Sequence, residues 1–336
     1  MRFFKMLNSK LKLSDSIFKK TIEKKATRDG YGEGLVEAGE KDKNLVVLCA
    51  DLTESTRSNF FKERFPERFV QVGVAEQVLA TVAAGMAAYG KVCFISSYAV
   101  FSPGRNWEQI RTTIALNDVP VKIAGAHTGI SVGPDGATHQ ALEDIALMRV
   151  MPNMVVLVPC DAVETKKCVI KAAQNKKPTY IRFTKQKTPV MTTDNSPFEI
   201  GKAEVFWKSE NPEVVVFACG PLVYEALLAA KKLFALGIES QVINCHSIKP
   251  IDEEMIVRQA MNAGCAVTVE EHQIAGGLGS AVAEVLVKNY PVPMEFVGMK
   301  DSFGESGKSK ELLKKYNMTS EDIVSSVKKV IRRKNS

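Results

Sequence analysis

Short β-rich runs alternate with helical stretches over most of this chain of 336 residues, and this alternation limits its fold more than any other feature. In the first half, β-rich runs begin at residues 45, 69, 92, 119, 154 and 179. Helical patterns lie among them, at 75–88, 106–116 and 161–173. Strands that alternate with helices predict a parallel sheet covered by helices on both faces.

A polar, proline-bearing stretch at 185–200 interrupts the alternation, and the pattern then restarts. Further β-rich runs begin at 213, 239, 266 and 293, with helical patterns at 221–236, 252–262, 279–288 and 308–316. We therefore predict an α/β fold with two consecutive open, mostly parallel sheets that carry helices on both faces. The expected division is an N-terminal extension at 1–21, a first domain at 22–187 and a second domain at 198–332.

Charge and cysteine content exclude several other classes of protein. The formal net charge is +7, but the basic residues are spread along the chain, so we expect no nucleic acid partner. The seven cysteines stand singly, without metal-ligand spacing, which is typical of reduced thiols in the cytoplasm. No apolar run approaches the ~18 residues that a bilayer-spanning helix needs, so we expect no membrane partner.

The first twenty residues are basic and weakly amphipathic. They contain an aspartate, few arginines and no evident cleavage site, which argues against an organelle-targeting peptide. We interpret this segment as a plain extension or a docking arm.

Glu76 places a carboxylate at the start of an apolar helical run that extends to Ala88. A carboxylate at a helix start gains about 0.3–1 kcal/mol from the helix dipole, which would be reason enough on an exposed helix. Here the neighbours Val72, Val74 and Val78 indicate burial, and a buried carboxylate is costly unless it has a partner or shares a proton. An aromatic ring nitrogen could be such a partner.

The loop after the fourth predicted strand holds His127 and His139, with Asp135 and several glycines between them. A loop of this kind can be a hydrogen-bonded turn or a binding site. Its histidine spacing matches no standard zinc pattern, so we predict no metal site. Ligands bind beyond the carboxyl ends of strands in α/β sheets, and the loops after the other strands also carry polar residues, with Arg182 at the end of the last one. The polar residues are therefore expected along one edge of the sheet, which favours a ligand-binding site there.

The motifs along the chain resemble those of thiamine-diphosphate enzymes of the transketolase type. Those similar to the pyrimidine-binding domain are ATRDGYG at 26–32, ADLTES at 50–55, GVAEQ at 73–77, HTGISVGPDGATHQ at 127–140, MPNMVVLVPCDAVE at 151–164 and IRFTK at 181–185. Those similar to the C-terminal domain are HSIKPID at 246–252 and VTVEEHQIAGGLGSAVAE at 267–284. The resemblance extends over about residues 22–332 and keeps the order of the motifs.

The resemblance implies a binding role for three residues around the pyrimidine ring of thiamine diphosphate. Glu76 matches the carboxylate that bonds the aminopyrimidine and promotes formation of the nucleophilic carbanion on the cofactor. Phe101 and Tyr98 fall where the family places aromatic walls, although two aromatic residues could also simply fill a core.

Further positions resemble the substrate contacts of the family. Those that match sugar-phosphate contacts are Arg28, Ser55, His127 and Arg182. An arginine suits this role because its planar guanidinium binds phosphate with two parallel hydrogen bonds. Asp135 matches a residue that recognises a substrate hydroxyl by a hydrogen bond. His139 matches one that helps proton transfer at the donor carbonyl. The implied catalytic residues are therefore Glu76, His127 and His139.

The motif that holds the diphosphate through Mg²⁺ in full-length transketolases has no counterpart here, since PDG at 134–136 lies inside the histidine loop. The resemblance thus implies the C-terminal subunit of a split transketolase, which transfers a two-carbon ketol unit between sugar phosphates. A separate N-terminal subunit would supply the diphosphate and Mg²⁺ site in an α2β2-like assembly. Alternatives are a deoxyxylulose-phosphate synthase, a 2-oxoacid dehydrogenase β subunit, a split transketolase for another sugar, and a non-catalytic partner subunit.

Overall fold

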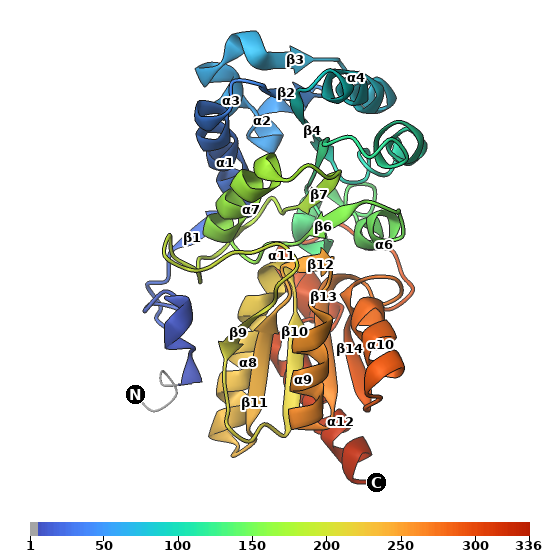
Figure 1. Cartoon of the computed structure of the whole chain (residues 1–336). Helices are drawn as coiled ribbons and strands as arrows, with labels where there is room; N and C mark the ends of the chain where they lie inside the picture. The colour runs from blue at the N-terminus through green and yellow to red at the C-terminus, as the bar shows by residue number, and fades with distance from the viewer. Residues whose placement is uncertain (1–5) are drawn as a thin grey trace.

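The computed structural model describes residues 6–336 of the chain. Two α/β domains lie end to end, the first in the blue and green half of the chain and the second in the yellow to red half (Figure 1). Within residues 6–336, no helix combines the length and the apolar character needed to cross a membrane.

The first domain is built on a seven-stranded sheet. Its strands, in spatial order, are β12 (Ser247–Lys249), β6 (Val155–Leu157), β7 (Thr179–Arg182), β5 (Lys122–Ala126), β4 (Val92–Tyr98), β2 (Leu45–Cys49) and β3 (Phe69–Gln71). All neighbours are parallel except β12 and β6. Because β12 comes from the second half of the sequence, this pairing ties the two domains together.

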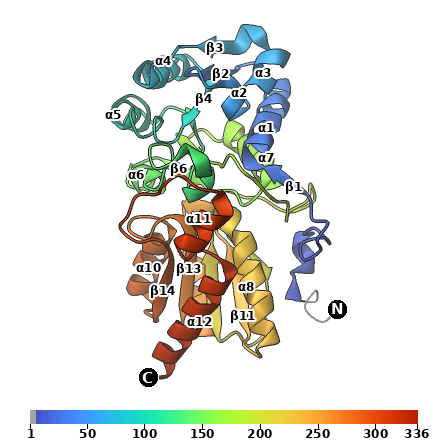
Figure 2. The same ribbon diagram turned by 180° about the vertical axis from the view of Figure 1, so that it is seen from behind.

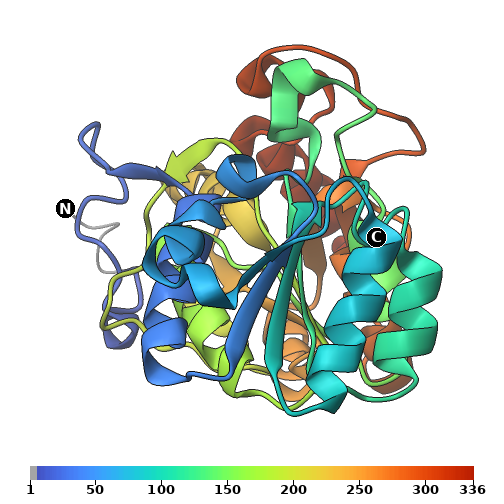
Figure 3. The same ribbon diagram turned by 90° about the horizontal axis from the view of Figure 1, so that it is seen from above.

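Helices cover both faces of this sheet (Figure 3). On one face lie α1 (Thr27–Lys41) and α7 (Ala162–Gln174), which bury Leu35 and Val169 against the sheet. On the other face lie α4 (Glu76–Ala88), the segment formed by α5 (Trp107–Gln109) with the π-helical turn Ile110–Ala115, and α6 (Asp144–Arg149).

The second domain has a five-stranded sheet and its own pair of helical layers (Figure 2). Its strands, in spatial order, are β14 (Met294–Met299), β13 (Ala266–Gln273), β10 (Val214–Ala218), β11 (Ser240–Asn244) and β9 (Glu204–Trp207). Only the edge strand β9 runs antiparallel to its neighbour. The flanking helices are α8 (Val223–Ala235) and α12 (Ser320–Asn335) on one face, and α9 (Glu253–Ala263) and α10 (Leu278–Asn289) on the other.

Smaller elements join the two domains. A short helix, α11 (Ser309–Lys315), packs against the 3-10 segment Ile130–Asp135 of the first domain. A two-stranded ribbon forms where β1 (Lys24–Ala26) pairs with β8 (Lys187–Pro189). Of these two strands, β8 lies in the stretch that was expected to separate the domains. Residues 6–23, which precede β1, lie against the second domain, with Ile17 fully buried in its core.

The predicted α/β fold with two mostly parallel sheets is confirmed. The expected strands and helices are all present, although the helix predicted at 106–116 is partly a π-helical turn. The prediction did not include several elements of the described chain, among them α1, α6, α12, the ribbon strands β1 and β8, the edge strand β9, and β12.

Candidate active site

Several of the predicted residues meet at the carboxyl edge of the first sheet. Glu76 follows β3, Tyr98 is the last residue of β4, and His127 follows β5 directly. The strands β2, β4 and β5 are parallel neighbours, so the loops that follow them lie side by side. This explains how residues some fifty positions apart in the sequence can share one site.

Glu76 is the first residue of α4 and only 2% exposed. Its main-chain carbonyl accepts a hydrogen bond of 2.8 Å from the Asn106 side chain, which fixes the start of the helix. The Oε1 atom receives a long contact of 3.5 Å from the Ser97 hydroxyl. The Oε2 atom is buried and has no hydrogen-bond partner among the described residues. Glu76 therefore keeps an acceptor that the rest of the chain does not satisfy.

Four aromatic rings, which we call the aromatic cluster, gather at the same edge: Tyr98, Phe101, His127 and His139. The Tyr98 ring stacks on His127 with centroids 4.0 Å apart, and its centroid lies 6.0 Å from that of Phe101. The His139 ring meets Phe101 edge-on at 5.7 Å. Tyr98, Phe101 and His139 are only partly buried, so the cluster has a face that a planar ligand could contact.

His127 is the most enclosed member of this cluster, at 1% exposure. Burial, reinforced by the nearby cations of Arg28 and Lys185, lowers the pKa of His127 to about 3. The imidazole is therefore neutral at physiological pH. Its Nδ1 atom is buried without a hydrogen-bond partner in the part of the chain that the structure describes.

Arg28 and Ser55, two of the predicted substrate contacts, lie next to each other. The Arg28 guanidinium donates a 3.0 Å hydrogen bond to the main-chain carbonyl of Ser55, in the short helix α2 (Thr53–Thr56). Burial and the neighbouring Arg57 lower the pKa of Arg28. Its Nε atom is buried and, within residues 6–336, unpartnered. A bound anion would satisfy this donor.

Asp135 is held by a residue that the sequence reasoning did not single out. The Lys185 ammonium group contacts both carboxylate oxygens of Asp135, at 3.0 and 2.8 Å. Both side chains are partly exposed, and Lys185 also acts electrostatically on His127. The motif IRFTK contains two cations, Arg182 and Lys185, and only Arg182 was predicted as a substrate contact.

Arg182 has a different environment from the other predicted substrate contacts. Its side chain is 2% exposed and forms an ion pair with Asp144, with a shortest distance of 2.7 Å. It also donates to the main-chain carbonyls of Ala141 and Glu271, at 3.3 and 2.8 Å. Although burial lowers the pKa of Arg182, the Asp144 carboxylate holds it above its ordinary value. Arg182 thus links β7 to β13 of the second domain.

The cofactor that the motifs imply can be tested against these residues. The unsatisfied Glu76 Oε2 could pair with a ring nitrogen, and Tyr98 and Phe101 could pack on a planar heterocycle, so the residues fit a pyrimidine. Among residues 6–336, no three or more His, Cys, Asp or Glu side chains are arranged to hold a metal ion.

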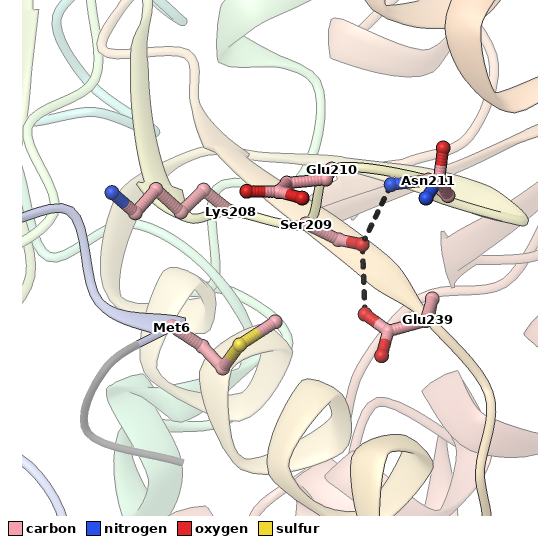
Figure 4. A pocket seen from close by; sticks show the side chains of 6 residues that line it. All are labelled: Met6, Lys208, Ser209, Glu210, Asn211 and Glu239. Atoms are coloured by element: carbon pink, nitrogen blue, oxygen red, sulfur yellow. Dashed lines mark hydrogen bonds between the residues drawn. The ribbon is translucent and has the colours of Figure 1, made fainter. Parts of the chain in front are cut away.

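A hollow of about 520 Å³ lies elsewhere, beside β9 in the second domain (Figure 4). In it the Ser209 hydroxyl donates to Glu239 at 2.7 Å and accepts from the Asn211 amide at 3.3 Å. These polar groups satisfy one another. None of the residues considered above lines this hollow, so we do not assign the chemistry to it.

Comparison with known families matches both halves of the chain. Residues 23–191 match the transketolase pyrimidine-binding domain, and residues 201–323 match the transketolase C-terminal domain. A Methanocaldococcus jannaschii protein provisionally named transketolase C-terminal section is 45% identical, over 89% of this chain and 94% of that protein. The human transketolase is 34% identical over 93% of this chain, which spans only 50% of the human enzyme.

Comparison with solved structures points to the same family. A structure described as a split gene transketolase in an inactive β4 tetramer superposes with a TM-score of 0.86. It is 47% identical and aligns over 92% of this chain and 99% of its own. A Campylobacter jejuni transketolase shares the fold, with a TM-score of 0.77 over 97% of this chain. The chain therefore belongs to the transketolase family, as a C-terminal subunit of the split kind.

Proposed function

We propose that this chain is the C-terminal subunit of a thiamine-diphosphate-dependent transketolase that moves a two-carbon ketol unit between sugar phosphates. Membership of the family implies dependence on thiamine diphosphate. The observation that carries the proposal is the buried Oε2 of Glu76, which has no hydrogen-bond partner among residues 6–336 and belongs to the same sheet edge as the aromatic cluster. A subunit with a purely structural role has no use for such a carboxylate.

Each residue of the site then has a role that its surroundings support. When bound, thiamine diphosphate would supply the carbanion chemistry that the reaction needs. Glu76 holds a proton at Oε2, shared with the pyrimidine nitrogen, while Asn106 keeps the helix start in place. Phe101 and Tyr98 orient the ring by packing on it. His139, at the more open side of the cluster, moves a proton at the substrate carbonyl.

For the substrate we propose a phosphate site made of Arg28, Ser55, His127 and Lys185. Arg28 has a free buried donor, and Lys185 is a partly exposed cation. His127 is neutral, so it contributes a hydrogen bond rather than a charge. Lys185 replaces Arg182 in this set because every bond of the Arg182 guanidinium goes to the protein and its side chain is buried.

We propose that Asp135 accepts a hydrogen bond from a substrate hydroxyl. It is partly exposed and pairs with Lys185 in the absence of substrate. A hydroxyl that donates to Asp135 and a phosphate that binds Lys185 would each replace one half of this pair. The ion pair thus keeps two ligand-binding groups close together before the substrate arrives.

We further propose that an N-terminal transketolase subunit completes the site and supplies the groups that hold Mg²⁺ and the diphosphate. The M. jannaschii relative is named as a section of the enzyme, and a 38% identical Clostridium relative is named as a subunit of a 6-deoxy-6-sulfo-D-fructose transketolase. An α2β2-like assembly is the arrangement we expect. The seven free, buried cysteines support a cytoplasmic location.

Helix α4 offers a surface for this assembly. Val78 and Val82 lie on α4, and Val74 lies two residues before it. These three valines, which we call the α4 face, are spaced four residues apart and are 47%, 37% and 72% exposed, respectively. Apolar side chains in such a row are typical of a protein interface. We propose that a second copy of the chain covers it, because the 47% identical relative is described as a β4 tetramer. Glu76 lies between two of these valines in the sequence, so assembly also encloses the site.

The sugar is a separate question, since relatives are named for different donors. Besides the Clostridium protein, a 36% identical Phocaeicola vulgatus relative is named a subunit of an apulose-4-phosphate transketolase. The cations Arg28 and Lys185 favour a phosphorylated substrate. We expect the chain, mixed with its N-terminal subunit, Mg²⁺ and thiamine diphosphate, to transfer a ketol unit from xylulose 5-phosphate to ribose 5-phosphate. Condensation of pyruvate with glyceraldehyde 3-phosphate, without ketol transfer, would instead indicate a deoxyxylulose-phosphate synthase.

A further inference from the structure

A pocket of about 420 Å³ lies where the two domains meet, and no member of the aromatic cluster lines it. The elements that border it are the segment before β1, the β1–β8 ribbon, α8 and α11, and they can be followed in Figure 2. None of the residues proposed for catalysis or substrate binding lines it. The transketolase reaction therefore gives this pocket no role.

The rim of the pocket is strongly basic. Its lysines come from three separate parts of the chain: Lys19, Lys20, Lys24, Lys187 and Lys310. All five are exposed, and none forms an ion pair with another residue in the range 6–336. Two carboxylates also line the pocket, but both accept main-chain hydrogen bonds, Glu225 from Ser320 at 2.9 Å and Glu271 from Ser131. The five lysines outnumber the two carboxylates, so the pocket has an excess of positive charge.

The walls of the same pocket are apolar. The residues that form them are Ile22, Pro189, Pro221, Leu222, Leu228 and Leu313. Ile22 and Leu222 are 8% and 2% exposed, so the inner wall is part of the packed structure. Apolar walls below a cationic rim fit a molecule with an apolar body and an anionic head.

The N-terminal segment is a fixed wall of this pocket. Ile17 is fully buried in the core of the second domain, and the Ser14 amide donates a 2.8 Å hydrogen bond to the Met191 carbonyl. These anchors hold the backbone that carries Lys19 and Lys20. A preformed pocket binds a ligand at a lower entropic cost than one that must be ordered first.

We propose that this pocket binds a small organic phosphate with an apolar body, as a site separate from the active site. A phosphate monoester is the preferred head group because it carries nearly two negative charges at neutral pH and several oxygens for lysine ammonium groups. The proposal gives the basic N-terminal segment, which the catalytic chemistry does not use, a role in ligand binding.

Isothermal titration of the full chain with hexyl phosphate tests the proposal. We expect one site per chain and binding at least about tenfold tighter than that of inorganic phosphate or of 1-hexanol. Inorganic phosphate lacks the apolar body, and 1-hexanol lacks the anionic head group. Hexyl phosphate that binds no tighter than inorganic phosphate would overturn the proposal.

Variants locate the binding. The double variant Lys24→Ala/Lys187→Ala removes two rim charges from the β1–β8 ribbon and should weaken hexyl phosphate binding about tenfold or more. Lys171→Ala, which removes an exposed lysine of α7, and Lys185→Ala, in the proposed active site, should leave this affinity unchanged. An unchanged affinity in the double variant, or its loss in Lys185→Ala, would show that the anion binds elsewhere.

Discussion

At the residue scale, the position of Glu76 is explained by what its two carboxylate oxygens do. One faces Ser97, and the other is buried without a partner among residues 6–336. The sequence already indicated an unusual buried carboxylate, because its neighbours are apolar. It could not show that this carboxylate shares a sheet edge with Tyr98 and Phe101, since this depends on how three loops meet.

Glu76→Gln keeps the shape of the side chain but cannot share a proton with a ring nitrogen. Loss of such assistance typically costs 10²- to 10⁴-fold, so the assembled enzyme should lose about 3–5 kcal/mol of transition-state stabilisation while still assembling. Exchange of the thiazolium proton in the complex, followed by NMR, measures this step directly. An exchange rate equal to that of the wild type would return Glu76 to a purely structural role.

Lys185 and Arg182 can be separated by a matched pair of alanine variants. Lys185→Ala should raise KM for a phosphorylated donor about 10- to 150-fold, since it removes a charge-assisted bond worth roughly 1.5–3 kcal/mol, and should barely affect hydroxypyruvate. Arg182→Ala leaves the buried Asp144 carboxylate without its cation, although the Tyr180 hydroxyl still donates to it at 2.7 Å. It should lower the free energy of unfolding by about 3–5 kcal/mol.

Steady-state kinetics with both donors, using an unphosphorylated aldehyde acceptor, and urea denaturation of both variants distinguish these effects. If Arg182→Ala is as stable as the wild type and loses only the phosphorylated donor, the phosphate role belongs to Arg182 after all.

The neutral state of His127 has a measurable pH signature. Its pKa is lowered from 6.5 to about 3, mainly by burial. Between these two pKa values the unfolded chain binds more protons at this position than the folded chain does. The neutral His127 therefore contributes fully to the stability of the folded chain above pH 6.5, and this contribution is lost as the pH falls towards 3. NMR titration of the imidazole signals, assigned with a His127→Gln variant, should show no His127 titration between pH 7 and 5. A midpoint near 6.5 would contradict the enclosed environment described here.

At the element scale, the sequence predicted strands better than it predicted helices with unusual composition. Helix α1 contains four glycines, which lower helix propensity and concealed it. The structure shows why one of them is needed, because a Cβ on Gly30 would lie 1.9 Å from the Ala162 carbonyl oxygen of α7. Strand β12 was missed for a different reason. Its three residues form a strand only because β6 lies beside them, and such a pairing has no local signal.

The α4 face makes a prediction about assembly. Val78→Glu places a charge in the middle of this apolar row and should shift the chain to a smaller species in light scattering, because a buried unpaired charge opposes association. Val287→Glu, at a 73% exposed valine of α10, is the matched control and should leave the assembly unchanged. Circular dichroism checks that both variants fold. If Val78→Glu assembles like the wild type, another surface carries the interface.

At the scale of the whole molecule, the two domains are joined by buried polar contacts as well as by β12. Arg182 donates to the Glu271 carbonyl, and the Ser131 amide donates to the Glu271 side chain. Ser131 lies in the same 3-10 segment as Asp135, so the second domain supports a loop that carries a proposed substrate contact. The two-domain arrangement was predictable from the repeated alternation of strands and helices. These contacts were not, because residues far apart in the sequence form them.

We propose that this chain carries the part of a thiamine-diphosphate site that contains Glu76, and that another subunit completes the site. Calorimetric titration of thiamine diphosphate with Mg²⁺ tests this most directly, first on the purified chain and then on its mixture with the N-terminal subunit. We expect no micromolar binding by the chain alone and micromolar binding by the mixture. Micromolar binding by the chain alone would contradict it.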